Sequence, residues 1–244
     1  MADMTIDDAD ARRRAWGVHL YTGSGAVLAL LALDAIGRDA FGAAFIWMAI
    51  AMFIDCTDGT LARRARVKQV LPQFDGSKLD DIIDYLNYVL VPVVLVVRAG
   101  LLPGYAFALL VASLPLLASG YGFCQAGAKT PDHFFTGFPS YWNIVVFYLY
   151  VLAAPLWFNV AVLVILSVLV FVPVRYLYPS RGTKFRKRTY LLALAWGVAV
   201  IWLLFQFPSP SRFLAIGSLA FPAYYMGASL KLHLSTPPSP PANG

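Results

Sequence analysis

Residues 55–84 read DCTDGTLARRARVKQVLPQFDGSKLDDIID and interrupt two long apolar stretches of the chain. The stretch before them begins at Phe41 and the stretch after them ends near Val97, and both are rich in aliphatic and aromatic residues. Charged side chains are costly at the end of an apolar helix, so a cluster of them there indicates a function. We therefore expect the acidic residues of this segment to form the functional site, held by two apolar helices.

The composition of the 244-residue chain is that of an integral membrane protein. Hydrophobic residues make up 59% of it and charged residues 13%, with a mean hydropathy of +0.67, whereas soluble domains contain about 25% charged residues. The apolar runs have about the 20 residues that a helix needs to cross the hydrocarbon core. The sequence therefore predicts an all-α integral membrane protein, and its net charge of +6 is interpreted as a topology signal rather than as nucleic-acid binding.

About eight transmembrane helices are predicted, preceded by a short interfacial helix around Arg12 to Trp16. The predicted spans are residues 19–36, 41–62, 79–97, 105–124, 141–154, 157–174, 190–207 and 213–230. Residues 1–18 are expected to form the polar N-terminal segment, residues 19–230 a single transmembrane catalytic domain, and residues 231–244 a disordered proline-rich tail. Six spans are the alternative, if residues 141–174 form one broken hairpin or if the last pair of spans is peripheral.

The distribution of basic residues predicts the orientation. Eight spans place both termini on one side, and with that side cytoplasmic 16 of the 19 Lys and Arg residues lie inside, the exceptions being Arg38, Arg98 and Arg212. This bias follows the positive-inside rule and puts residues 55–84 at the cytoplasmic face. The N-terminus lacks the apolar core of a cleaved signal peptide. Cys56 and Cys124 lie in separate segments on the same side and are expected to form no disulfide.

Helical spacing groups the carboxylates. Asp55 and Asp58 share one face of the second span, and Asp80 and Asp84 share one face of the third. If the two helices face each other, four acids converge and need cations to remain ionised. Carboxylate oxygens suit Mg²⁺ or Mn²⁺, and a pair of such ions suits chemistry at a phosphorus atom.

Small and basic residues accompany these acids. Gly59 allows a close approach to the backbone, Ala62 leaves space beside the carboxylates, and Arg63 can bind phosphate oxygens. Asp75 and Asp81 lie off the acidic face and are expected to face solvent or to support the ligands.

Eight of these residues reproduce the pattern DxxDGxxAR...GxxxDxxxD, and on them the chain resembles the CDP-alcohol phosphotransferase family, membrane enzymes of phospholipid synthesis. The residues are Asp55, Asp58, Gly59, Ala62, Arg63, Gly76, Asp80 and Asp84. Residues 64–75 form a connector that is longer than usual in the family. A longer connector resembles a bacterial branch that uses choline, as do FCQAGAKTPDHFFTGFPSYWN (residues 123–143) and PVRYLYPSR (residues 173–181).

The resemblance implies a core of six helices plus two more, and a site with two divalent ions, Mn²⁺ or Mg²⁺. Asp55, Asp58 and Asp80 would hold one ion, and Asp55, Asp80 and Asp84 the other, with Asp84 also acting as the general base. A second set of residues would bind the cytidine diphosphate group and the lipid phosphates, namely Gly59, Ala62, Arg63, Gly76 and Arg181.

The implied reaction transfers the phosphatidyl group of CDP-diacylglycerol to choline and releases CMP, in the inner membrane of a bacterium. A homodimer is also implied by the family. Choline donates no N–H hydrogen bond, so aromatic faces are expected to select it. The candidates flank the loop after the fourth span and are Tyr121, Phe123, Phe138, Tyr141 and Trp142. Thr22 and Ser24 are expected to bond helix carbonyls rather than the nucleotide.

Two other functions are compatible with the acidic motif. The same chemistry on serine, inositol or glycerol phosphate would need the same acidic motif. A cation transporter would also need carboxylates within the membrane, but the inverted repeats typical of many transporters are not visible in the sequence. The expected partners are therefore the two substrates and membrane lipids, and no nucleic acid.

Overall fold

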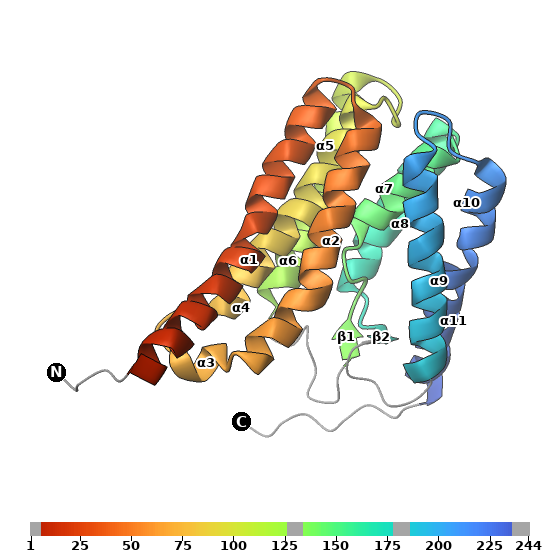
Figure 1. Cartoon of the computed structure of the whole chain (residues 1–244). Coiled ribbons are helices and arrows are strands. Elements are labelled where there is room, and N and C mark those ends of the chain that lie inside the picture. Colours follow the sequence, from red (N-terminus) through yellow and green to blue (C-terminus); the bar gives the residue numbers. More distant parts are fainter. Residues whose placement is uncertain (1–5, 126–133, 178–185, 236–244) are drawn as a thin grey trace. The chain divides into compact units, whose positions relative to one another are not determined.

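The structure of the chain is a computed structural model that describes residues 6–125, 134–177 and 186–235 (Figure 1). It divides into two compact units, Met1–Gly100 and Leu101–Gly244, called unit 1 and unit 2 below. The described residues of both units are mostly helical. The prediction of a single catalytic domain over residues 19–230 stays a prediction.

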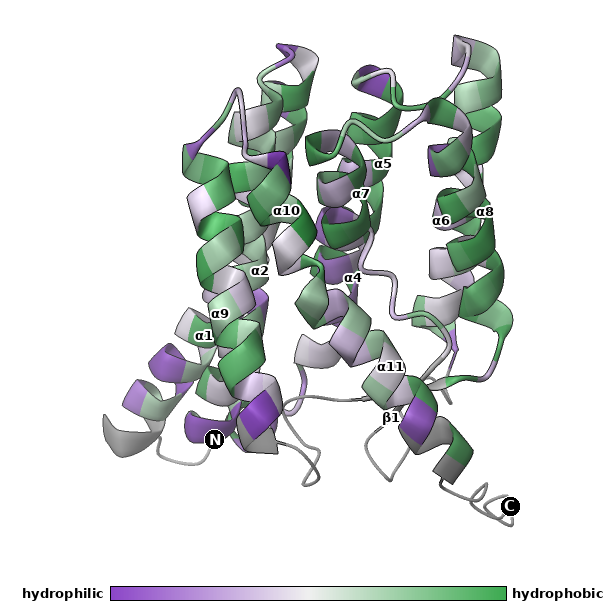
Figure 2. Cartoon of the chain, turned by 90° about the vertical axis from the view of Figure 1, so that its right-hand side faces the viewer, coloured by the Kyte–Doolittle hydropathy of each residue, from purple (hydrophilic) through white to green (hydrophobic). Residues whose placement is uncertain are grey.

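The helices confirm the prediction of an all-α, multi-pass integral membrane protein. Among the described residues, five helical stretches are long and apolar enough to cross a membrane: Ala9–Gly37, Phe41–Arg64, Tyr105–Cys124, Arg188–Phe205 and Arg212–Lys231. Large apolar side chains such as Leu20, Phe205 and Phe213 are exposed on the helices, as expected where lipid replaces water. Figure 2 shows hydrophobic residues continuing along α6 (Tyr105–Cys124) and α8 (Leu156–Phe171), and hydrophilic residues at the start of α1.

Unit 1 contains the first three predicted spans. Its elements are α1 (Ile6–Gly37), α2 (Phe41–Arg64), α3 (Val67–Val70), α4 (Gly76–Asp84), the π-helix η1 (Tyr85–Leu90) and α5 (Val91–Arg98). Helix α1 packs against α2, α4 and α5. The third span is one continuous run of α4, η1 and α5, in which the π-helix follows directly after Asp84. Such π-helical turns are rare and occur often at functional sites.

The predicted interfacial helix is not a separate element. The polar residues before the first span belong to α1, which runs unbroken from Ile6 to Gly37. No proline interrupts this part of the sequence, so the backbone hydrogen bonds of the helix continue through it.

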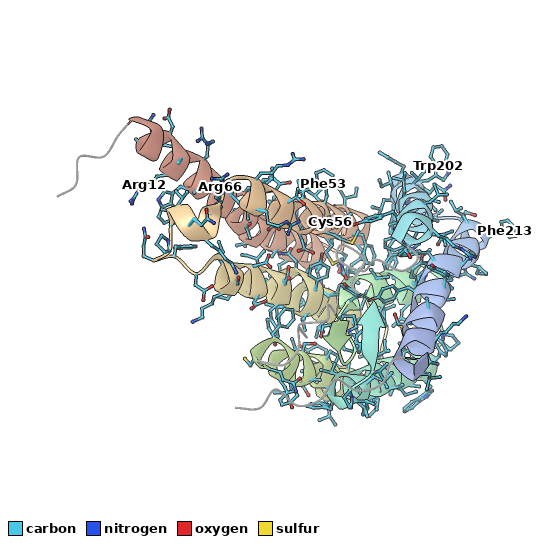
Figure 3. The ribbon with its side chains drawn as sticks, turned by 90° about the horizontal axis from the view of Figure 1, so that it is seen from below. Arg12, Phe53, Cys56, Arg66, Trp202 and Phe213 are labelled. Atoms are coloured by element: carbon cyan, nitrogen blue, oxygen red, sulfur yellow. The ribbon has the colours of Figure 1, made fainter. Side chains whose placement is uncertain are left out.

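The long connector folds back onto the start of α1. Val67 and Leu71 are buried, and they pack in one cluster with Ala15 and Val18 of α1. Residues Val67–Val70 of the connector form the short helix α3, so the connector is not an open loop. Figure 3 shows Arg66, next to α3, near Arg12 of α1, so basic residues from both segments lie at the same end of unit 1.

Unit 2 contains helices over the five remaining predicted spans. They are α6, α7 (Trp142–Val151), α8, α9 (Arg186–Phe205) and the pair α10 (Arg212–Ser218) and α11 (Ala220–Ser235). Helices α6 and α8 pack together. Helix α7 has only 10 residues, about 15 Å of helix, so it is much shorter than the others. The indole N–H of Trp196 in α9 donates to the Tyr148 hydroxyl of α7 over 2.8 Å.

Two short strands are an addition that hydrophobic patterning did not predict. Strand β1 (Phe134–Thr136) pairs antiparallel with β2 (Arg175–Leu177), with Phe135 opposite Tyr176. These strands lie in residues 123–143 and 173–181, the two segments that resemble the choline-using branch. The sheet therefore joins the two segments within unit 2.

Candidate active site

Three of the four predicted carboxylates converge in unit 1. Asp55 lies on α2, whereas Asp80 and Asp84 lie one turn apart on α4. One carboxylate oxygen from each of the three lies within 4.8 Å of the other two, and all three residues are half-buried. This agrees with the expectation that the two helices face each other. Three carboxylates this close repel one another unless they are protonated or a cation lies between them.

The fourth carboxylate, Asp58, is held apart from this cluster. It is buried, and its Oδ2 atom accepts a hydrogen bond of 2.7 Å from the Thr22 hydroxyl of α1. On a helix a residue three positions further along lies about 60° around the axis, and here that rotation brings Asp58 against α1. Its predicted role as a ligand of one ion stays a prediction.

The polar residues of the first span have different partners. Ser24 donates to the carbonyl of Tyr21 over 2.6 Å, which confirms the expected helix-carbonyl bond. Thr22 instead bonds the Asp58 carboxylate, which its spacing on α1 did not predict. The Tyr21 hydroxyl lies 2.8 Å from the Thr57 hydroxyl of α2. Hydroxyl groups of α1 therefore contact the acidic end of α2 at two neighbouring positions.

A residue that sequence reasoning missed, Tyr88, also contacts the cluster. Its hydroxyl donates to Oδ2 of Asp55 over 2.6 Å, and the residue is buried. Tyr88 lies in η1, one turn after Asp84. Tyr88 follows Asp84 by four residues, and this spacing was the one sign in the sequence that it could lie near the acids. A tyrosine in an apolar span is, however, ordinarily interpreted as a lipid-facing or packing residue.

Gly76 is enclosed by a histidine of α1. A Cβ atom at this position would lie 2.6 Å from Cε1 of His19 and 3.2 Å from its Nδ1. The His19 ring is itself buried and packs against Phe74, with ring centroids 4.3 Å apart. Gly76 thus has a packing reason to be glycine, separate from its predicted contact with the nucleotide.

The start of α4 is capped by the connector. The Asp75 carboxylate accepts hydrogen bonds from the backbone N–H groups of Ser77 (3.1 Å) and Lys78 (3.0 Å). Because a cap of this kind satisfies N–H groups that have no partner in the helix, Asp75 sets where α4 begins. It supports the geometry of Asp80 and Asp84 through the backbone.

The residues predicted to bind the nucleotide lie beside the acids on α2. Gly59 is half-buried, and a Cβ atom there would meet only Nη1 of Arg63, at 3.4 Å. Arg63 is exposed, and its Nη2 atom donates to the Thr60 hydroxyl over 3.0 Å. Ala62 is half-buried and packs against the cluster of Ala15 and the connector. Their contacts with a nucleotide stay predictions.

The five residues predicted to bind choline all lie in unit 2. Trp142 is fully buried, and its indole N–H donates to the Ser119 hydroxyl over 2.8 Å. Phe138 is also buried and meets Trp142 edge-on. Tyr121 is about half exposed and packs on Phe171.

Phe123 and Tyr141 are half-buried, and Arg181, predicted to reach the lipid diphosphate, lies outside the described residues. The choline site stays a prediction.

The three clustered carboxylates fit a divalent cation. They supply hard oxygen ligands from two helices, which is the donor type that Mg²⁺ and Mn²⁺ prefer. One or two ions at this position would offset the repulsion between the carboxylates.

Comparisons with known proteins identify the family of the chain. Residues 20–174 match the family described as CDP-alcohol phosphatidyltransferase. The chain is 41% identical over 219 residues to a protein of Legionella pneumophila named phosphatidylcholine synthase, covering 87% of this chain and 86% of the relative.

Two further relatives carry the same name. The protein from Pseudomonas aeruginosa is 38% identical, with 90% of this chain and 92% of the relative covered. The protein from Agrobacterium fabrum is 36% identical, with 82% and 83% covered. The matched family region contains all four carboxylates of the acidic motif, and the chain belongs to the CDP-alcohol phosphatidyltransferase family.

Proposed function

We propose that this protein is a membrane transferase that moves the phosphatidyl group of CDP-diacylglycerol to choline, giving phosphatidylcholine and CMP. The observation that carries the proposal is the convergence of Asp55, Asp80 and Asp84 in the register of the family motif. The acceptor follows from the relatives named phosphatidylcholine synthase, which align with most of the chain. Membership of the family also argues against the cation-transporter alternative.

The reaction needs one bond to form and one to break. The oxygen of choline attacks the phosphorus atom that carries the diacylglycerol, and the bond from that phosphorus to the CMP oxygen breaks. Asp84 accepts the proton of the choline hydroxyl as the new bond forms. Two divalent ions, when bound, would neutralise the diphosphate and the departing CMP.

Other residues of unit 1 would bind the cations and the nucleotide. Asp55, Asp80 and Asp84 would hold the cations, with Asp58 as the additional ligand of one of them. Gly59, Ala62 and Arg63 would receive the cytidine diphosphate group, because they lie on the same helix end as Asp55 and Asp58. Arg63 is exposed, so its guanidinium is available to phosphate oxygens.

The site would lie at the cytoplasmic face of the bacterial inner membrane, with both termini in the cytoplasm. The basic residues of α1 and the connector support this orientation. Arg64 ends the helix that carries Asp55 and Asp58, and it is exposed. Arg12 and Arg66 are also exposed and lie near each other in Figure 3. Reporter fusions at the C-terminus measure the orientation directly. The homodimer implied by the family stays a prediction. Light scattering of the protein in detergent would test it by measuring the oligomeric state.

One assay tests the proposal. Purified protein is incubated with CDP-diacylglycerol, Mn²⁺ and one alcohol at a time from a panel of choline, serine, inositol and glycerol phosphate, and CMP is measured. We expect CMP release with choline alone among these. Release with serine but not with choline would disprove the acceptor and keep the reaction type, whereas no release with any alcohol would disprove the enzyme function. Repeating the assay with Mg²⁺ in place of Mn²⁺ identifies which ion supports turnover.

A further inference from the structure

The hydroxyl group of Tyr88 reaches the carboxylate cluster from a part of the third span that carries no acidic residue. It donates to Oδ2 of Asp55 over 2.6 Å, across 33 residues of sequence. Tyr88 is only 6% exposed, so water does not compete well for this bond. Of the two oxygens of Asp55, one is therefore engaged by a neutral donor within the protein.

The π-helix explains how Tyr88 arrives at this position. Four residues of α-helix turn by about 400°, so a residue four positions further along is displaced by about 40° around the axis. Asp80, Asp84 and Tyr88 are each four residues apart, and in an unbroken α-helix that displacement would accumulate. A π-helical turn holds more residues than an α-helical one, and it therefore turns Tyr88 back toward the face that carries Asp84.

Asn87 supports this turn from the side of α1. Its Nδ2 atom donates to the carbonyl of Ile83 in α4 and to the carbonyl of Gly25 in α1, both over 3.0 Å. A Cβ atom at Gly25 would overlap the side chain of Ile83, so α1 and α4 are in close contact here. The position of Tyr88 is thus set by packing between helices as well as by its own bond to Asp55.

We propose that Tyr88 is a positioning residue of the metal site: its hydroxyl holds the Asp55 carboxylate in the orientation in which that carboxylate meets Asp80 and Asp84 and can bind a cation with them. This inference rests on the proposed function only in taking the cluster as a metal site. Donors that hold a ligand carboxylate in one orientation contribute substantially to metal affinity, and losing one typically lowers affinity or activity about 10- to 100-fold.

A purely structural role predicts something different. A buried tyrosine hydroxyl needs a hydrogen-bond partner in any case, and Asp55 is an available acceptor. If that were all, removing the hydroxyl would lower the stability of the protein but leave its affinity for metal unchanged. The metal affinity of a Tyr88→Phe variant therefore separates the two roles.

The experiment measures Mn²⁺ binding to the purified full-length protein by electron paramagnetic resonance, in which the signal of free aqueous Mn²⁺ falls as the ion binds. Tyr88→Phe keeps the ring and removes only the hydroxyl. We expect its Mn²⁺ dissociation constant to rise about 10- to 100-fold. The matched control is Tyr148→Phe, which removes a buried, hydrogen-bonded hydroxyl in unit 2 and should leave Mn²⁺ affinity unchanged.

Turnover provides the second readout. The Mn²⁺ concentration that gives half-maximal CMP release should rise by the same factor in Tyr88→Phe, and saturating Mn²⁺ should restore most of the wild-type kcat. This concentration does not depend on the amount of active enzyme, so it can be measured in membranes if the variant is unstable in detergent. Mn²⁺ affinity within twofold of wild type, or activity that excess Mn²⁺ does not restore, would overturn the inference.

The outcome also distinguishes this inference from the proposed function. A wild-type protein that binds Mn²⁺ but releases no CMP, together with weaker binding by Tyr88→Phe, would contradict the function and support the role of Tyr88. A wild-type protein that releases CMP from CDP-diacylglycerol with choline as the acceptor, together with a Tyr88→Phe variant whose Mn²⁺ affinity is unaltered, would support the function and refute the role of Tyr88.

Discussion

Gly76→Ala should destabilise unit 1, although alanine normally stabilises a helix. The added Cβ atom would lie 2.6 Å from Cε1 of His19, whereas carbon atoms in contact are ordinarily about 3.5–4.0 Å apart. The buried His19 ring is packed against Phe74 and Trp16, so it or the start of α4 must move by about 1 Å to reach that spacing.

The two opposing effects differ in size. Replacing glycine with alanine in the middle of a helix gains about 0.5–1 kcal/mol, and Gly76, as the first residue of α4, gains at most this amount. Forcing an extra methyl group into a well-packed site costs about 1–3 kcal/mol. The expected net result is a loss of about 1 kcal/mol in the free energy of unfolding. Because Asp80 lies one turn after Gly76 on α4, the same displacement should also lower kcat for CMP release.

The melting temperature of the purified protein in detergent tests this prediction. The matched control is Gly17→Ala in α1, where a Cβ atom would meet nothing within 4 Å, and its melting temperature should equal or exceed that of wild type. In a His19→Ala background the space is available, so Gly76→Ala should no longer destabilise. A Gly76→Ala protein as stable as the Gly17→Ala protein would refute the steric reasoning. The need for glycine at position 76 would then have to come from its predicted contact with the nucleotide.

Four other substitutions test the site. Asp84→Asn should abolish CMP release, because an amide cannot accept the proton, but it should still bind nucleotide in a fluorescence assay. If the variant turned over as fast as wild type, Asp84 would be excluded as the base. Thr22→Val removes the donor to Asp58 and should cost about 1.5–3 kcal/mol of stability, the usual range for a hydrogen bond to a charged group; an unchanged melting temperature would show that the bond contributes nothing. Tyr121→Ala, at a ring about half exposed, should raise the KM for choline and lower stability less than Trp142→Ala does. Trp142→Ala, at a fully buried ring, should cost about 3–5 kcal/mol in unfolding assays. Equal KM values in wild type and Tyr121→Ala would remove Tyr121 from the choline site.

Much of the architecture could be predicted because it depends on local properties of the chain. Each predicted span contains a helix, since hydropathy and helix length are read from consecutive residues. The interfacial helix was predicted as a separate element, whereas α1 runs unbroken from Ile6 to Gly37, because helix continuation through a polar segment depends on the absence of a breaking residue rather than on hydropathy. The β1 and β2 pairing was missed because strands of three residues have too few positions to show an alternating pattern.

The sequence by itself determined the membrane class, the approximate positions of the helices and the spacing that makes Asp55, Asp80 and Asp84 available for one site, because these follow from composition and from the period of the helix. Only the tertiary structure decided that Asp58 bonds Thr22, that Tyr88 bonds Asp55 and that His19 encloses Gly76. The physical reason is the same in each case. These contacts join helices that are separated by tens of residues, and which side chains meet across such helices depends on their rotation and packing rather than on any pattern within one of them.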